Sequence, residues 1–192
     1  MKKILIGTHN MGKFKELSFL ISNKIKKISP KTLKIKSPKE TGKTFSANAI
    51  LKAKYFSKFT KLPVIADDSG LCIKALNGKP GIHSARWAKK YGGFSNSIKV
   101  ILKRMKYKKN RSAQFVCSLS YKSPKGKIVV VVGKLNGKIS YDSKGKKGFG
   151  YDPIFIPRLK KITFGQMSKI KKIKSDHRFL AFKKLKKKIK IL

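Results

Sequence analysis

Acidic side chains are rare in this chain, so their positions indicate where it could do chemistry. The 192 residues include only 7 Asp and Glu against 50 Lys and Arg. Five of these acids lie in four turn-like segments that contain glycine or serine: Glu40 in ETGKTF, Asp67 and Asp68 in ADDSG, Asp152 in GFGYDP and Asp176 in SDHR. Surrounding lysines keep carboxylates ionised, as a hard cation such as Mg²⁺ requires of its ligands. Each acid taken alone is better explained as a helix cap or turn former, but together they favour a metal site.

The adjacent acids Asp67 and Asp68 follow the apolar residues 64–66, which are typical of the end of a buried strand. If the strand stays extended, the two carboxylates point to opposite faces. Gly70 permits a turn, so we expect LPVIADDSGLCIKAL to form a strand, a tight turn and a second strand. The adjacent pair is therefore not expected to act as a symmetric dyad.

A second candidate site is the segment GTHNMGKFKEL, residues 7–17, which follows the strand-like MKKILI. Gly7, Gly12 and Lys13 fit the pattern G-x-x-x-x-G-K of a phosphate-binding P-loop. Phe14 stands where the magnesium-binding Ser or Thr of that motif belongs. Three interpretations are open at this point: an incomplete P-loop, a different phosphate-binding loop, or a coincidental pair of glycines.

Apolar periodicity places these segments in an α/β fold. We expect a buried strand at residues 2–7, a helix at residues 12–22 and a second helix capped by Thr44 or Ser46. SAQFVCSLSY alternates apolar and polar residues, and IVVVVGKL after KSPKGK is its expected hairpin partner. Strands that alternate with helices early and pair as hairpins later predict a mixed, twisted β-sheet flanked by helices. The length suits one well-cored domain over residues 1–192.

The net charge of +43 has two explanations. It is either a surface for nucleic acid or anionic membrane, or a compositional bias toward Lys and Ile of the kind seen in AT-rich genomes. Lysines occur in every segment and arginines number only five, whereas nucleic-acid readers favour arginine. The distribution favours compositional bias, with non-specific attraction to polyanions as its consequence.

The sequence also restricts the cellular setting. Cys72 and Cys117 lie in apolar runs without a CxxC or Cys/His neighbour, so buried thiols are expected rather than a disulfide or zinc site. No apolar run approaches the roughly 20 residues of a membrane span. We expect a cytoplasmic protein without a membrane partner or a specific nucleic-acid partner.

The ordered set of motifs resembles the inosine triphosphate pyrophosphatase family nearly from end to end. GTHNMGKFKEL is similar to the family's T-x-N-x-x-K phosphate loop, and ETGKTFSANAILKA to its E-x-G-x-T-F-x-x-N-A helix entry. PVIADDSGLCIKALNGKPGIHSARWA resembles the central A-D-D-S-G-L block, followed by GFGYDPIF and the HR pair near the C-terminus. Each motif is moderately specific, but five in order at family-like spacing form a strong signal.

By position, the resemblance implies a phosphate loop, two metal-binding carboxylates and a group of substrate contacts. Asp68 matches the proton acceptor and a metal ligand, Glu40 matches the second metal ligand, and Asp67 is a further candidate. The phosphate-loop residues are Thr8, His9, Asn10, Met11, Gly12 and Lys13. The other substrate contacts are Ser69, Phe149, Gly150, Tyr151, Asp152, Lys172, His177 and Arg178.

The part of the sequence that matches the base-reading residues departs from the family pattern. His177 and Arg178 match the pair that reads the base, and Phe149 matches the residue that stacks on it. The family usually has Ser directly before the His-Arg pair, where this chain has Asp176. An acid at this position could orient His177. Of the properties that the resemblance implies, the base preference is therefore the one that this departure affects most. His83 replaces the family's usual Tyr before the S-A-R triplet.

The implied activity is Mg²⁺-dependent hydrolysis of ITP, dITP and XTP to the nucleoside monophosphate and pyrophosphate, before these nucleotides enter DNA or RNA. The resemblance also implies two lobes with an active-site cleft between them, and a homodimer. Two rival functions remain open. One is a basic nucleic-acid-binding protein that retains the fold without hydrolysis, and the other is a pyrophosphatase that acts on modified pyrimidine nucleotides.

Overall fold

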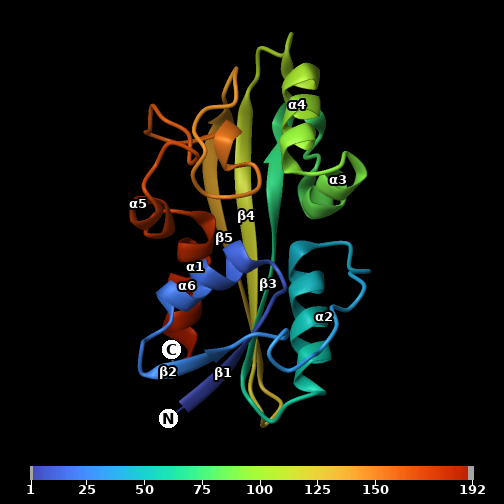
Figure 1. Cartoon of the computed structure of the whole chain (residues 1–192), viewed down its shortest axis with the longest axis vertical. Coiled ribbons are helices and arrows are strands. Elements are labelled where there is room, and N and C mark those ends of the chain that lie inside the picture. Colours follow the sequence, from blue (N-terminus) through green and yellow to red (C-terminus); the bar gives the residue numbers. More distant parts are fainter. Residues whose placement is uncertain (1, 190–192) are drawn as a thin grey trace. The chain divides into compact units, whose positions relative to one another are not determined.

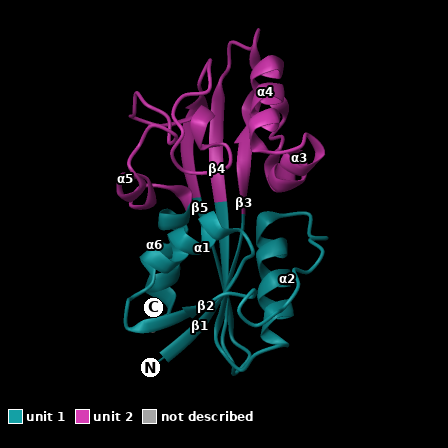
Figure 2. Ribbon diagram, viewed as in Figure 1, with its two compact units in different colours: residues 1–68, 117–133, 178–192 teal, residues 69–116, 134–177 magenta. Residues whose placement is uncertain are grey.

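The computed structural model describes residues 2–189, and the chain divides into two compact units (Figure 2). Unit 1 comprises residues 1–68, 117–133 and 178–192, and unit 2 comprises residues 69–116 and 134–177. Each unit therefore combines segments that lie far apart in the sequence.

Within residues 2–189, six strands form one sheet in the order β2-β1-β3-β4-β5-β6 (Figure 1). The strands are β1 Lys2–Gly7, β2 Ile25–Ile28, β3 Val64–Ile73, β4 Ser112–Lys122, β5 Ile128–Ile139 and β6 Phe155–Pro157. β1 pairs in parallel with β2 and β3, whereas β5 and β6 are antiparallel. The mixed sheet confirms the predicted α/β class.

The helices are α1 Met11–Leu20, α2 Phe45–Ser57, α3 Ser84–Lys90, α4 Phe94–Met105, α5 Lys169–Ile173 and α6 His177–Lys188. In the part of the chain that the structure describes, no helix has the length and apolar character needed to cross a membrane.

In unit 1, α1 and α6 cover one face of the sheet and α2 covers the other (Figure 1). Alternation along β1 produces this arrangement, because Ile4 and Ile6 pack in the cluster with α1 and α6 while Leu5 packs with Phe56 of α2. A Cβ at Gly7 would lie 2.6 Å from the Phe56 ring, so the close approach of α2 requires glycine at the end of β1.

In unit 2, α4 packs on the other halves of β3, β4 and β5. Phe115 of β4 lies at the centre of an aromatic group, with ring centroids 4.4 Å from Phe155 and 6.1 Å from Phe164. Tyr151 is 2% exposed in the same core, where its hydroxyl lies 2.8 Å from Ser97 Oγ and donates to the Ser84 carbonyl at 3.1 Å.

Several local predictions are confirmed. β1 has the expected bounds, and Thr44 caps α2 by accepting a hydrogen bond from the Ala47 N–H at 3.0 Å. The turn between β4 and β5 is closed by the Ser123 N–H, which donates to the Lys127 carbonyl at 2.8 Å. Cys72 and Cys117 are both thiols, and Cys117 is buried as expected, whereas Cys72 is only half-buried.

The expected turn in LPVIADDSGLCIKAL is wrong, because the segment forms one continuous strand, β3. Val64 and Ile65 are buried in unit 1, and Leu71 and Ile73 are buried in unit 2. Apolar burial on both sides of ADDSG therefore keeps the backbone extended through Gly70.

Replacing Tyr151 with Phe is expected to destabilise the protein by about 1–3 kcal/mol, because the buried Ser97 hydroxyl and Ser84 carbonyl lose a hydrogen-bond partner. Urea-induced unfolding followed by circular dichroism measures this change. The control is Tyr107→Phe, since Tyr107 is 86% exposed. Equal stability of the two variants would show that the Tyr151 hydroxyl does not stabilise the core.

Candidate active site

The predicted phosphate loop links β1 to α1 and is closed by its own side chains. The Thr8 hydroxyl accepts a hydrogen bond from the Asn10 N–H at 3.2 Å. Asn10 caps α1, because its side-chain oxygen accepts from the Lys13 N–H at 3.1 Å. The loop therefore ends at a helix N-terminus, whose N–H groups and dipole favour phosphate. Phe14 packs against the core of unit 1, so the position that holds a hydroxyl in a P-loop is a packing position here.

His9 attaches this loop to the segment that follows β2. Its Nε2 donates to the Ile35 carbonyl at 2.9 Å, and its Nδ1 accepts from the Ser37 hydroxyl at 2.6 Å. Both ring nitrogens are therefore engaged within unit 1. Met11 and Gly12 form the first turn of α1.

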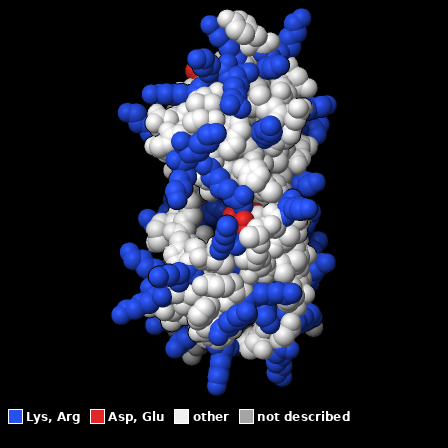
Figure 3. All heavy atoms as spheres, turned by 90° about the vertical axis from the view of Figure 1, so that its right-hand side faces the viewer, with Lys and Arg blue, Asp and Glu red and all other residues white. Residues whose placement is uncertain are grey.

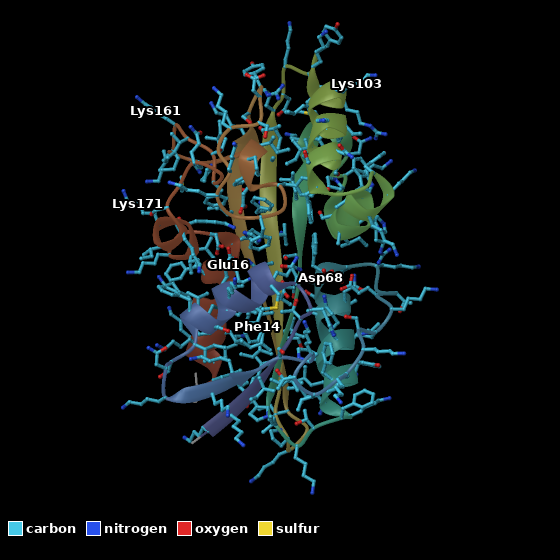
Figure 4. The ribbon with its side chains drawn as sticks, viewed as in Figure 1. Phe14, Glu16, Asp68, Lys103, Lys161 and Lys171 are labelled. Atoms are coloured by element: carbon cyan, nitrogen blue, oxygen red, sulfur yellow. The ribbon has the colours of Figure 1, made fainter. Side chains whose placement is uncertain are left out.

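Asp67 faces α1 and α6 and is 0% exposed. Its Oδ2 lies 3.1 Å from Lys13 Nζ and accepts from Arg178 Nη2 at 3.5 Å, and Arg178 Nη1 donates to Glu16. Phe14 and Glu16 project from α1 in Figure 4. Burial opposes ionisation of Asp67, but the charges of Lys13 and Arg178 outweigh it and hold the pKa well below the usual range. Asp67 is thus the ionised centre of a buried ion-pair network.

Asp68, the next residue of β3, faces α2. Its Oδ2 accepts from Asn48 Nδ2 at 3.0 Å, and its Oδ1 lies 3.8 Å from Lys52 Nζ. Burial raises the pKa of Asp68, and the nearby Lys52 charge offsets this only in part. The prediction that the two aspartates point to opposite faces is confirmed, and the pair is electrostatically unequal.

Glu40 joins Asp68 through Lys52, whose Nζ lies 2.5 Å from Glu40 Oε1. Burial disfavours the charge of Lys52, but the carboxylates of Asp67, Asp68 and Glu40 together raise its pKa. Asn48 supports the arrangement, since its side-chain oxygen accepts from the Gly42 N–H at 2.7 Å in the ETGKTF loop.

The two carboxylates fit a hard divalent cation. The side-chain ammonium group of Lys52 lies within 4 Å of carboxylate oxygens of both Glu40 and Asp68, so the local charge favours a cation there. Within residues 2–189 no group of three or more His, Cys, Asp or Glu side chains is arranged to hold a metal ion. Two carboxylates suffice for Mg²⁺ when substrate phosphates and water supply the other ligands.

In unit 2, the predicted substrate contacts Phe149, Asp152 and Lys172 lie together. Asp152 Oδ2 lies 2.5 Å from Lys172 Nζ and accepts from the Phe149 N–H at 2.8 Å. Lys172 Nζ also lies 4.4 Å from the centroid of the Phe149 ring. Gly150 adopts a positive φ of 66° in the turn between them. Buried Asp152 thus orients both the lysine and the backbone that carries the aromatic ring.

The remaining predicted residues have different surroundings. His177 is buried and stacks on Phe115, with ring centroids 4.7 Å apart. Tyr151 is a core residue with its hydroxyl turned inward, and Ser69 is half-buried on β3.

Three residues of these networks were not identified from the sequence: Glu16, Asn48 and Lys52. Glu16 had a signal, because it is one of only 7 acids. Asn48 and Lys52 lie one turn apart on α2, which places both on the face toward Asp68.

Comparison with known proteins shows close similarity along nearly the whole chain. Residues 4–188 match the model of the Ham1 family. A dITP/XTP pyrophosphatase from Caulobacter vibrioides is 40% identical over 186 residues, which cover 96% of both chains. A dITP/XTP pyrophosphatase from Dictyoglomus thermophilum is 42% identical over 189 residues, which cover 95% of this chain and 92% of the relative.

Solved structures show the same fold. A HAM1 protein from Coxiella burnetii aligns with a TM-score of 0.89 and 33% identity over 100% of both chains. The Staphylococcus aureus Ham1 protein aligns with a TM-score of 0.86 and 37% identity over 98% of both chains.

Replacing Asp67 with Asn is expected to destabilise the protein by about 3–5 kcal/mol at neutral pH, because Lys13 and Arg178 lose the buried charge between them. The folded-state pKa of Asp67 lies below its ordinary value of 3.8, so its stabilisation is present above that pH and is lost as pH falls. Between pH 3.8 and the lower folded-state pKa, the difference in the free energy of unfolding between wild type and variant should narrow by about 1.4 kcal/mol for each pH unit.

Urea unfolding at about pH 7 and about pH 3 measures this narrowing. The control is Asp142→Asn, which removes an exposed carboxylate and should change stability by less than about 0.5 kcal/mol. If the free energies of unfolding of Asp67→Asn and wild type differ by the same amount at both pH values, the assignment of Asp67 as the ionised centre is refuted.

Proposed function

Since the chain belongs to the Ham1 family, we propose that it hydrolyses the non-standard purine nucleoside triphosphates ITP, dITP and XTP to the monophosphate and pyrophosphate. This activity removes such nucleotides from the pool before they enter DNA or RNA. The proposal rests most directly on the unequal carboxylates of β3, with Asp67 held ionised by cations and Asp68 aimed at a cation position.

The triphosphate binds at the start of α1. Thr8, Asn10 and the first turn of α1 shape the backbone there, and the helix dipole adds positive potential. Lys13 carries its charge on this same first turn, where Asp67 fixes the direction of its side chain. Because Lys13 is held in place, it offsets charge that develops on the phosphate without being reoriented.

Glu40 and Asp68 would hold Mg²⁺. The bound ion would supply Lewis-acid polarisation of the phosphate oxygens. Lys52 lies between the two carboxylates and keeps them together before the ion binds.

Asp68 accepts the proton of the water that attacks the α-phosphorus, and pyrophosphate leaves. Burial raises the pKa of this carboxyl, which makes it a stronger base than an exposed aspartate. Asn48 fixes Oδ2 by a hydrogen bond, so Oδ1 faces Lys52.

The residues that we propose for the base are Phe149, Lys172 and the His-Arg pair. Phe149 stacks on the base beside Lys172, whose direction Asp152 determines. Donors from His177 and Arg178 suit the 6-oxo acceptor of hypoxanthine and xanthine and oppose the 6-amino group of adenine. Glu16 orients the Arg178 guanidinium. Guanine shares the 6-oxo group, so its rejection depends on its 2-amino group.

The functional molecule that we propose is a cytoplasmic homodimer, with no membrane partner. The near-complete coverage of the pyrophosphatase relatives supports a single catalytic domain over residues 1–192.

The decisive experiment is a pyrophosphate-release assay with ITP, dITP, XTP, GTP and ATP in the presence of Mg²⁺, with a panel of modified pyrimidine triphosphates beside them. We expect ITP, dITP and XTP to be hydrolysed at least about tenfold faster than ATP or GTP, since wrong hydrogen-bond partners cost at least that factor. Equal or faster turnover of ATP and GTP would refute the purine specificity. Preferred turnover of pyrimidine substrates would identify a different pyrophosphatase.

Replacing Asp68 with Asn is expected to lower kcat by about 10²–10⁴-fold, because the variant cannot accept the proton of the attacking water. Circular dichroism and thermal unfolding establish that the variant is folded. Asp142→Asn is the matched control, since it removes an exposed carboxylate of unit 2 and should leave kcat unchanged. A folded Asp68→Asn variant with full activity would exclude Asp68 as the base.

A further inference from the structure

Unit 2 carries a hollow of about 460 Å³ that lies between the start of β4, the end of β5 and the loops around β6. Pockets for small ligands have volumes of about 300–1,000 Å³. The residues that line the hollow do not include any member of the Asp152, Lys172 and Phe149 group. The hollow is therefore a separate feature of this unit, and the function proposed above does not use it.

Arg111 forms the rigid floor of the hollow. It is 8% exposed, and its guanidinium donates to the carbonyls of Ile139 at 2.8 Å, Met105 at 3.0 Å and Ser140 at 2.6 Å. These hydrogen bonds fix the plane of the guanidinium and join the ends of α4 and β5. All three guanidinium nitrogens of Arg111 thus donate to backbone carbonyls, and its face is a further contact surface.

Tyr141 lies on that face. The Arg111 Cζ is 4.2 Å from the centroid of the Tyr141 ring, yet the tyrosine is 76% exposed. The preceding residue fixes the turn, because the Ser140 hydroxyl donates to the Asp142 carbonyl at 2.6 Å. An aromatic ring held on one side by a cation and open to solvent on the other can stack a nucleobase.

Four exposed lysines line the same hollow as this ring: Lys109, Lys138, Lys144 and Lys161. Lys161 projects outward from the loop between β6 and α5 in Figure 4. Asp142 is the one acidic residue in the lining. Ammonium groups bind phosphate as point charges, so the lining offers phosphate contacts beside a stacking surface.

Charge alone does not locate a site on this protein. Lys and Arg are scattered over the whole face shown in Figure 3, as the net charge of +43 requires. What marks the hollow is that a concave volume, an aromatic ring packed on the Arg111 guanidinium and several lysines coincide there.

We propose that this hollow is a second nucleotide-binding site, at which a base stacks on Tyr141 and its phosphates contact Lys109, Lys138, Lys144 and Lys161. The ligand is a phosphorylated nucleotide, either free or as the terminal unit of a single strand. This proposal goes beyond the hydrolytic function and uses different residues, so either can fail without the other.

The first test measures binding of α,β-methylene-ATP, whose α–β bridge cannot be hydrolysed and whose adenine does not suit the proposed hydrolytic site. Isothermal titration calorimetry measures the affinity, and salt at about 150 mM screens non-specific electrostatic attraction. Tyr141→Ala should weaken binding about tenfold or more through the loss of stacking. The control is Tyr107→Ala, since Tyr107 is 86% exposed and does not line the hollow. Equal affinities of the two variants would overturn the proposal.

The second test separates a built site from general charge. One variant combines Lys109→Gln, Lys138→Gln, Lys144→Gln and Lys161→Gln. The control combines Lys89→Gln, Lys90→Gln, Lys99→Gln and Lys103→Gln, four exposed lysines of the same unit that do not line the hollow. Both variants lose the same charge, so the proposal predicts a loss of affinity of about tenfold or more in the first only. Equal losses would show diffuse attraction and overturn the proposal.

A third titration identifies the source of the nucleotide, with a 5′-phosphorylated single-stranded trinucleotide as the probe. Tighter binding of the trinucleotide, with the same sensitivity to Tyr141→Ala, assigns the site to nucleic-acid ends. Tighter binding of α,β-methylene-ATP, with that sensitivity, assigns it to free nucleotides. If Tyr141→Ala changes the affinity of neither ligand, the proposal of a second site is overturned.

Discussion

The buried ion pair between Asp67 and Lys13 is the interaction on which the candidate active site depends. Asp67 is fully buried in β3, and a carboxylate in that position stays ionised only because Lys13 and Arg178 approach it. Through these contacts one side chain joins the phosphate loop, the start of α6 and the central strand. Asp68 then takes a different role, because the alternation of the strand turns it toward α2 and the Glu40–Lys52 pair.

The same arrangement explains the ambiguous GTHNMGKFKEL segment. Phe14 packs into the core of unit 1, so α1 is anchored at the position where a P-loop presents a hydroxyl to magnesium. The carboxylates suited to a metal lie elsewhere, on β3 and in the loop before α2. The loop is thus specialised for phosphate and the Glu40–Asp68 pair for a cation. Phosphate binding and magnesium binding, which a single motif performs in P-loop proteins, are thus assigned to two separate elements here.

Much of the fold and of the candidate site was predictable from local sequence patterns, and the exceptions have physical causes. Alternation and capping identified β1 and the opposite directions of Asp67 and Asp68, and restricted the cap of α2 to Thr44 or Ser46, because these features depend on neighbouring residues. The continuity of β3 was missed, since Gly70 permits a turn and only burial of the strand on both sides decides against it. The contact between Glu16 and Arg178 joins residues 162 positions apart and has no local signature.

The central claim is that the pKa values of two neighbouring acids of one strand are shifted in opposite directions by their different surroundings. A ¹³C NMR titration of the aspartate side-chain carboxyls in the metal-free protein tests it most directly, with Asp67→Asn and Asp68→Asn for assignment. The account predicts that Asp67 titrates below the ordinary value of 3.8 and Asp68 above it. Titration of both carboxyls at the same pH, or in the reverse order, would contradict it.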